Sequence, residues 1–398
     1  MGDIYETAAI TIVAASAHNC NQSFLQRRSY PWGVQGWKAF KLPIRCPDGK
    51  RGELICDPED SYFSGEQPIN HRAWTLQEFL LPPRKLVYST TQLIWQCRSV
   101  QTELGGLVKK FEYIKESFRN GFILTQIMPA VLSKDTASVF PASDPTAKGV
   151  YDAWSNWENL VEDYSGRALT NREDTLPGIS GIASKFFNYL NEEYTAGLWY
   201  RESNPSNFVN ELLWNVRQHN FSISHKQTSS ESYIAPSWSW AGQPRRVEFI
   251  SSIFKKKMVC SIVERSVQLA TVAPFGQVKS GSLKIQAMTA KVDRRRNDDK
   301  AHSLRDNIDF LDRDDIDILL DDAVENLEAR LGTGPLWCLL LTVNEGLLVM
   351  PLDEKNWLRI GIFCGRGGIG KVRDGRMERS ESLSEWFQDR EFEEVTIV

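Results

Sequence analysis

The chain of 398 residues is 41% hydrophobic and 25% charged, the composition of a globular protein long enough for two or three domains. Its net charge of -4 gives no general attraction to nucleic acid or to an anionic membrane, and no apolar run is long enough to span a bilayer. Seven scattered cysteines without C-x-x-C spacing indicate neither a disulfide framework nor a zinc site, and they favour a reducing cytoplasmic compartment.

The first predicted strand lies in residues 8–15, where Ile10, Thr11, Ile12 and Val13 form a nearly continuous apolar run. Such runs are typical of strands buried on both faces of a parallel sheet. Very little chain precedes this strand, so its parallel neighbours must come from later in the chain or be missing. A hairpin is predicted next, around a Pro-Asp-Gly-Lys turn at residues 47–50.

The most informative stretch runs from residue 71 to residue 97. Trp74, Leu76, Leu80 and Leu81 follow a helical spacing. Pro82 and Pro83 forbid continuation of that helix. Two segments rich in β-branched and aromatic residues follow, at 85–89 and 93–97, and predict a β-hairpin.

Two polar residues of the predicted helix are candidates for a special role. Arg72 and Glu78 are six residues apart and so do not share a helix face, which argues against a direct ion pair. Glu78 lies four residues from Trp74 and is predicted to accept a buried hydrogen bond from backbone or a tryptophan N–H. For these residues, a role in holding the helix to the sheet is favoured over ligand contact.

A set of residues in the helix and hairpin forms a recognisable pattern of residue types and order. The set comprises Arg72, Trp74, Thr75, Leu76, Gln77, Glu78, Pro83, Arg84, Trp95 and Cys97. This pattern resembles the signature of the fungal heterokaryon incompatibility (HET) domain. Residues 1–12 resemble the helix-to-strand segment just upstream of that signature. Residues 163–183, 197–199 and 235–241 resemble segments that follow the domain.

The resemblance implies a non-enzymatic role in vegetative incompatibility, where HET-domain proteins signal programmed cell death after recognition of non-self through protein partners or self-association. It also implies a core similar to the Toll/interleukin-1 receptor (TIR) fold, so the alternative is an NAD-cleaving enzyme. The Ser-Tyr-x-Trp-Gly-like and Trp-Ile-Asp-x-x-Cys-Ile-like strands of the family do not occur here. The prediction is therefore a member truncated at its N-terminus, with an incomplete nucleotide site and no assigned catalytic residue, cofactor or metal.

Residues 101–245 are predicted to be mainly helical and to end in a Pro-Ser-Trp-Ser-Trp segment. Helices are expected at 107–118, at 151–164 and at 208–216. A further helix is expected to begin at a capping box, Thr170 to Glu173, and to run to about Leu190. Consecutive helices with short connections indicate a helical subdomain.

Strands are predicted after residue 246. They are expected at 247–254, 258–263, 282–290, 336–343, 347–352, 358–363 and 395–398. The fold prediction is thus an α+β or α/β chain in three regions: a partial TIR-like α/β core in 1–100, a helical region in 101–245 and a β-rich region in 246–398.

Three further motifs resemble sites for phosphate, calcium or hydrolytic chemistry, but none has the full pattern that such a site needs. The glycine-rich run 365–371 matches a phosphate-binding loop in spacing, but Val372 follows where Ser or Thr would hold Mg²⁺, so it is read as a loop. The acidic run 309–317 lacks the register of a calcium loop and is read as a solvated face. Ser237 and Ser239 lack the flanking glycines of a nucleophile elbow.

Overall fold

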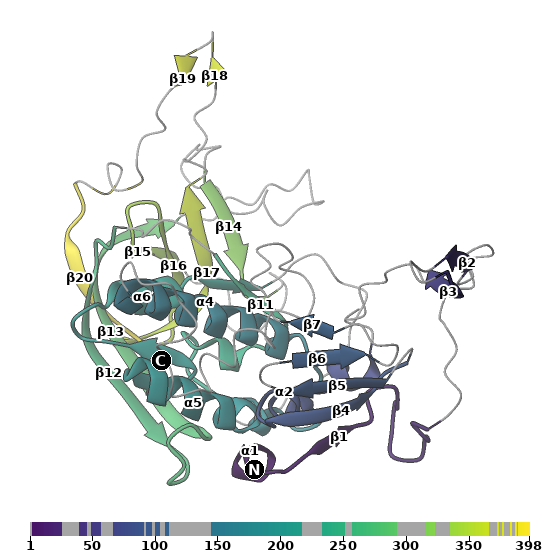
Figure 1. Ribbon diagram of the computed structural model, residues 1–398. Helices are drawn as coiled ribbons and strands as arrows, with labels where there is room; N and C mark the ends of the chain where they lie inside the picture. Colours follow the sequence, from purple (N-terminus) through teal and green to yellow (C-terminus); the bar gives the residue numbers. More distant parts are fainter. Residues whose placement is uncertain are drawn as a thin grey trace, which may run out of the picture. The chain divides into compact units, whose positions relative to one another are not determined.

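The computed structural model divides the chain into two compact units, Met1–Asp135 and Thr136–Val398, which are considered separately (Figure 1). It describes residues 2–25, 40–45, 49–56, 67–90, 93–97, 100–103, 108–110, 145–216, 233–250, 257–292, 316–322, 335–365, 372–373, 376–377, 383, 387 and 389–398. The division expected from the sequence, at residues 100/101 and 245/246, stays a prediction.

The first unit is built on a five-stranded sheet in the order β1-β4-β5-β6-β7. Its strands are β1 (Thr11–Val13), β4 (Arg84–Tyr88), β5 (Leu93–Cys97), β6 (Val100–Glu103) and β7 (Val108–Lys110). β1 pairs with β4 in parallel, as expected, and the connection between them contains helix α2 (Trp74–Leu80). The other pairs are antiparallel because short connections join consecutive strands.

This sheet contradicts the expected TIR-like α/β core, because only one of its four strand pairs is parallel. The first strand is also not buried on both faces, since the Ile10 and Ile12 side chains are 46% and 60% exposed. Val108–Lys110 forms a strand within the segment expected to be helical. The hairpin expected near residue 47 is present as β2 (Phe40–Arg45) and β3 (Arg51–Cys56).

A small core holds this sheet. Alternate residues of β4 and β5 are buried, the period of two that places one side of a strand against a core. The buried apolar side chains come from β1, the residues just after it, β4 and β5, and the partly buried ones from the segments before β4. They are Val13, Ala15, Val87 and Ile94, with Ile69 and Phe79 packed against them.

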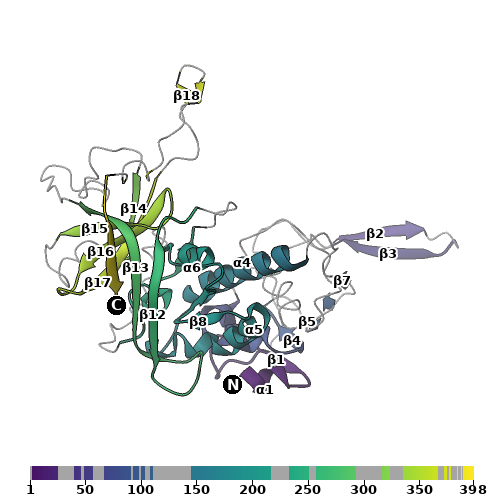
Figure 2. The ribbon, with the colours of Figure 1, turned by 90° about the vertical axis from the view of Figure 1, so that its left-hand side faces the viewer.

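The second unit contains a closed five-stranded barrel (Figure 2). Its strands are β13 (Val278–Val292), β15 (Leu336–Leu340), β16 (Glu345–Pro351), β17 (Asn356–Gly365) and β20 (Phe392–Ile397). β20 closes the ring because it pairs antiparallel with β13 and parallel with β17. β12 (Ser261–Leu269) and β14 (Ile316–Leu320) extend the sheet outside the ring. Closure leaves the ring strands without free edges.

The barrel core is made of aliphatic and aromatic side chains from these strands, together with Leu383 and Phe387 from the segment before β20. Its most buried members include Cys338, Leu340, Leu348, Phe363 and Phe387. Gly346 is required for close strand approach, since a Cβ atom there would lie 2.0 Å from the carbonyl oxygen of Leu339. Each strand expected after residue 246 has a counterpart among the observed strands.

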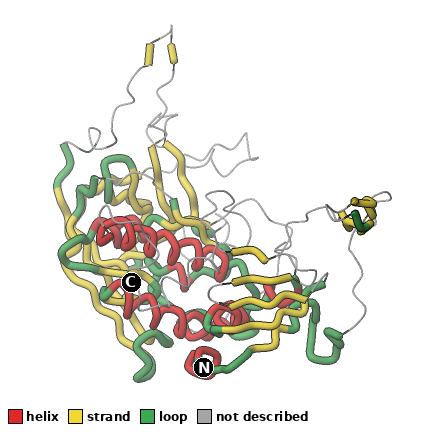
Figure 3. Tube along the Cα trace, viewed as in Figure 1, coloured by secondary structure: helices red, strands yellow, loops and turns green. Residues whose placement is uncertain are grey.

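Helices and strands alternate in the first part of this unit (Figure 3). The helices are α4 (Pro145–Ser165), α5 (Ser180–Leu190) and α6 (Ser206–Glu211). The strands are β8 (Glu193–Thr195), β9 (Leu198–Tyr200), β10 (Trp214–Val216) and β11 (Val247–Phe249).

The expected helical middle region is therefore wrong. The helix predicted over 208–216 ends at Glu211. Trp214–Val216 instead forms a strand that pairs antiparallel with Val247–Phe249. The predicted capping box is displaced by one residue, since the Asn171 side chain, not Thr170, accepts from the Glu173 N–H. It caps a short 3₁₀ turn, Arg172–Asp174, ahead of α5.

Candidate functional site

The start of helix α2 is fixed by Thr75. Its hydroxyl lies 2.6 Å from the carbonyl oxygens of both Ile69 and Arg72, to which it donates. These carbonyls belong to the 3₁₀ turn Pro68–His71 and the residue after it, so Thr75 ties that turn to the helix. Both acceptors lie within six residues of Thr75 in the sequence, so the hydroxyl stabilises the local junction between the 3₁₀ turn and the helix.

The end of the helix is tied to the sheet by Lys85. Its ammonium group donates to the carbonyl oxygen of Phe79 at 2.8 Å and lies 4.4 Å from the centre of the Phe79 ring. The Lys85 side chain is buried, whereas its neighbour Arg84 is exposed. Arg84 pairs in register with Cys97, and Leu86 with Trp95.

The predicted motif residues thus fall into three groups by burial. The buried ones are Thr75, Leu76 and Gln77. The partly buried ones are Trp74, Glu78, Pro83, Trp95 and Cys97, and the exposed ones are Arg72 and Arg84.

Glu78 contacts Tyr5 of helix α1 (Gly2–Glu6), which brings together two segments that the sequence analysis singled out separately. The pKa of the Tyr5 phenol is raised, first by partial burial and then by the charge of the Glu78 carboxylate and a hydrogen bond to it. Tyr5 donates and Glu78 accepts, so Glu78 has a tyrosine as a hydrogen-bond partner, which the sequence analysis did not name.

In the second unit, the Pro-Ser-Trp-Ser-Trp segment is the centre of a network of buried hydrogen bonds. The carbonyl oxygen of Gly197 accepts from the indole N–H groups of Trp157 at 3.1 Å and Trp240 at 2.9 Å. The Ser239 hydroxyl donates to the Ala196 carbonyl oxygen. These bonds fix the turn between β8 and β9 against the tryptophan-rich segment.

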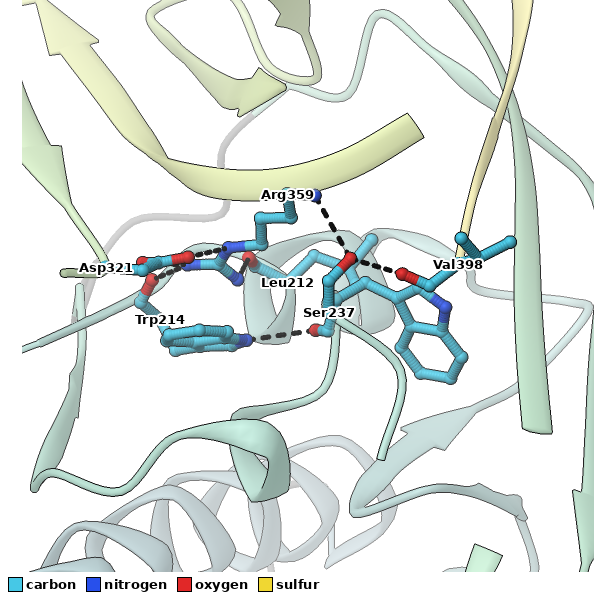
Figure 4. A network of polar contacts seen from close by, with 7 residues as sticks. Leu212, Trp214, Ser237, Asp321, Arg359 and Val398 are labelled. Carbon is cyan, nitrogen blue, oxygen red and sulfur yellow. Dashed lines mark hydrogen bonds and ion pairs between the residues drawn. The ribbon is translucent and has the colours of Figure 1, made fainter. Parts of the chain in front are cut away.

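A buried arginine joins this segment to the barrel (Figure 4). Arg359 of β17 makes an ion pair with Asp321, with Nε 3.1 Å from a carboxylate oxygen. Its terminal nitrogens donate to the carbonyl oxygens of Leu212, at 2.8 Å, and of Trp214. Burial raises the pKa of Asp321, and the facing guanidinium offsets part of that effect.

Ser237 is a structural residue in this network. Its hydroxyl donates to the backbone oxygen of Val398 and accepts from the Arg359 backbone N–H at 3.0 Å (Figure 4). The Ser239 hydroxyl is engaged in the same way, accepting from the Ala241 N–H at 3.1 Å. Because backbone groups use both hydroxyls, neither serine is arranged as an activated nucleophile.

Two buried glutamates lie near the β8–β9 hairpin. Burial raises the pKa of Glu192 to about 7, although Arg201 donates to it at 2.8 Å and offsets part of the effect. Burial raises the pKa of Glu211 well above its usual range, although one carboxyl oxygen accepts from the Trp199 N–H at 2.7 Å. In both glutamates burial therefore favours the protonated, uncharged carboxyl group.

Sequence reasoning did not identify Arg359, Asp321 or Glu211. One signal was available: Arg359 interrupts an otherwise apolar strand, and a charge there needs a buried partner. Its partners lie far away in sequence, so they could not be named. Residues 366–371 of the glycine-rich run and 309–315 of the acidic run lie outside the described residues.

No group of three or more acidic, histidine or cysteine side chains suited to a metal ion occurs within the described ranges. Among the helices that the structure describes, none combines the length and apolar character needed to cross a membrane. Comparison with protein-family models, curated proteins and solved structures finds no match to this chain.

Proposed function

We propose that the protein is a HET-like signalling protein of fungal heterokaryon incompatibility that acts by protein contact to promote programmed cell death. The proposal rests on the motif sequence and on the division of the motif by burial. The buried Thr75, Leu76 and Gln77 serve the fold, while Arg72 and Arg84 present charge to solvent. Exposed arginines are well suited to bind carboxylates on a partner surface.

The NAD-cleaving alternative loses its support, because it depended on a TIR-like core and the sheet order contradicts that core. The serines of the tryptophan-rich segment, whose hydroxyls are held by backbone groups, supply no hydrolytic nucleophile in its place. Protein contact is therefore the function that the geometry supports best.

The test is inducible expression of the full chain in a filamentous fungus, with viability measured by dye uptake and colony growth. We expect viability to fall as the protein accumulates. A matched control is Leu76→Asp, which places a carboxylate in the buried side of α2 and should abolish the folded motif. Normal growth at full wild-type protein levels would overturn the proposal.

A further inference from the structure

Three neighbouring side chains in the second unit each bury a polar atom that makes no hydrogen bond within the described part of the chain. The atoms are the hydroxyl oxygen of Tyr194 in β8, the indole nitrogen of Trp199 in β9 and one carboxyl oxygen, Oε1, of Glu211 in α6. Trp199 and Glu211 are both 0% exposed. Nearly all buried polar groups in native proteins have a partner, either protein or ordered water, because an unmet hydrogen bond is costly.

These three side chains form one polar cluster. Tyr194 and Trp199 lie directly opposite each other in the β8–β9 hairpin, so their side chains share one face of it, with ring centres 5.0 Å apart. Glu211 reaches the same hairpin, where its other carboxyl oxygen accepts from the Trp199 backbone N–H at 2.7 Å. Burial and, after it, the charge of Glu211 raise the pKa of the Tyr194 phenol. The phenol and the carboxyl group are therefore close, although no direct hydrogen bond joins them.

The chemistry of the cluster calls for a neutral ligand that both accepts and donates hydrogen bonds. An indole N–H can only donate, which disfavours a bare cation, while a carboxyl oxygen needs a donor. An anion is also disfavoured, because the carboxyl groups of Glu158 and Glu192 lie near Glu211. Besides burial, their charges raise the pKa of Glu211.

The surroundings limit the size of this ligand. Trp157 of α4 packs against both rings of the hairpin face, with its ring centre 6.1 Å from that of Tyr194 and 5.4 Å from that of Trp199. These are distances of direct aromatic contact. Large side chains thus pack closely around the cluster, which suits a ligand the size of water.

We propose that ordered water binds in this polar cluster and bridges Tyr194, Trp199 and Glu211. The water accepts from the Trp199 indole and the Tyr194 hydroxyl and donates to Oε1 of Glu211, which gives it the roughly three hydrogen bonds typical of a buried water. It links α6 to the hairpin face beside the bond from Glu211 to the hairpin backbone. This site does not depend on the role proposed for the motif residues of the first unit.

Removing the Tyr194 hydroxyl distinguishes a bridged cluster from a dry one. If water bridges the hydroxyl, Tyr194→Phe breaks a hydrogen bond and should lower the ratio of folded to unfolded chain by about fivefold. If the hydroxyl has no partner, the same change removes a costly buried polar group and should raise that ratio. Urea unfolding of the full chain gives the sign of the change. A raised ratio would overturn the proposal.

Tyr200→Phe is the matched control, because Tyr200 lies next to Trp199 in β9 and so points to the other face of the hairpin. It should have a smaller effect than Tyr194→Phe, and equal losses would overturn the proposal. Replacing Na⁺ by K⁺ in the buffer should leave the unfolding midpoint of the wild type unchanged. A midpoint that depends on the cation would assign the cluster to a cation instead.

Nuclear magnetic resonance detects the water itself. In the full chain with isotope-labelled tryptophan, the Trp199 indole N–H signal is the one that Trp199→Phe removes. We expect cross-relaxation between this buried proton and the water resonance, because a bridging water stays bound beside it. An indole signal without contact to water would overturn the proposal, whatever the result of the unfolding measurements.

Discussion

The guanidinium carbon of Arg359 lies 3.2 Å from the centre of the Trp214 ring, and the same guanidinium donates to the backbone oxygen of Trp214 (Figure 4). Arg359 belongs to the barrel and Trp214 to the strand that follows α6. The Arg359 side chain therefore links the helix-and-strand part of the second unit to the barrel.

Replacing Arg359 by Met should lower the free energy of unfolding by about 3–5 kcal/mol, because Asp321 would remain buried without its partner. The double variant Arg359→Met, Asp321→Leu should recover part of that loss. Urea unfolding followed by tryptophan fluorescence measures both. Arg245→Met removes the ion pair of a half-exposed arginine with Asp322 and should cost no more than about 1 kcal/mol. An equal loss in the two single variants would contradict the role given to Arg359.

Glu211 should make stability depend on pH. Its pKa in the folded state is raised, so the folded chain keeps a proton that the unfolded chain loses above about pH 4.3. The stabilisation that the protonated Glu211 contributes is fully present below that pH, and it is lost as the pH rises toward the pKa of Glu211 in the folded state.

Glu211→Gln should therefore flatten the pH dependence by up to about 1.4 kcal/mol per pH unit in this window, while keeping an acceptor for the Trp199 N–H. Chemical denaturation from pH 4 to pH 9, the range over which this window is scanned, measures the slope. Glu354→Gln, at an exposed site, is the control. Parallel curves for wild type and Glu211→Gln would show that Glu211 is ionised in the folded state.

Gly197 should not tolerate a side chain. Its φ is +100°, and an added Cβ would lie 2.6 Å from the indole nitrogen of Trp240. Gly197→Ala should cost more than about 2 kcal/mol, from backbone strain together with displacement of the indole. Gly242→Ala, whose new Cβ would meet atoms only at 3.5 Å, should cost much less. Thermal unfolding of the two variants decides the point, and similar midpoints would refute it.

The Tyr5–Glu78 bond should hold α1 to α2 with modest energy. Tyr5→Phe should raise amide hydrogen exchange in residues 74–80 by an amount equivalent to about 0.5–1.5 kcal/mol. Combining it with Glu78→Gln should cost less than the sum of the single changes, as coupled residues do. Ile4→Ala, at an exposed position of the same helix, is the control. Strict additivity would mean that the two side chains act independently.

Local patterns in the sequence predicted local structure. The spacing of Trp74, Leu76 and Leu80 and the prolines after them located α2, and the β-rich segments after it located the β4–β5 hairpin. These two predictions succeed because the residues that determine a helix or a hairpin lie within a few positions of one another in the sequence.

Long-range pairing could not be predicted in this way. The barrel closes because Phe392–Ile397 pairs with β13, about a hundred residues earlier in the chain. The sequence of either strand contains no pattern that identifies the other as its partner. The apolar run at residues 10–13 predicts a strand buried on both faces, but apolar composition does not distinguish a central strand from an exposed edge. The partners of Arg359 come from three separate segments, at residues 212–214, 237 and 321, which only the fold brings together.

The central claim is that the buried motif residues support the fold while the exposed arginines make the contact that signals. The most direct test is the double variant Arg72→Ala, Arg84→Ala in the viability assay, with thermal unfolding measured in parallel. We predict an unchanged unfolding midpoint and loss of the effect on viability, whereas Thr75→Val should lower the midpoint, because it removes the hydroxyl that ties the 3₁₀ turn to α2. A stable double arginine variant that reduces viability as strongly as the wild type would contradict the claim.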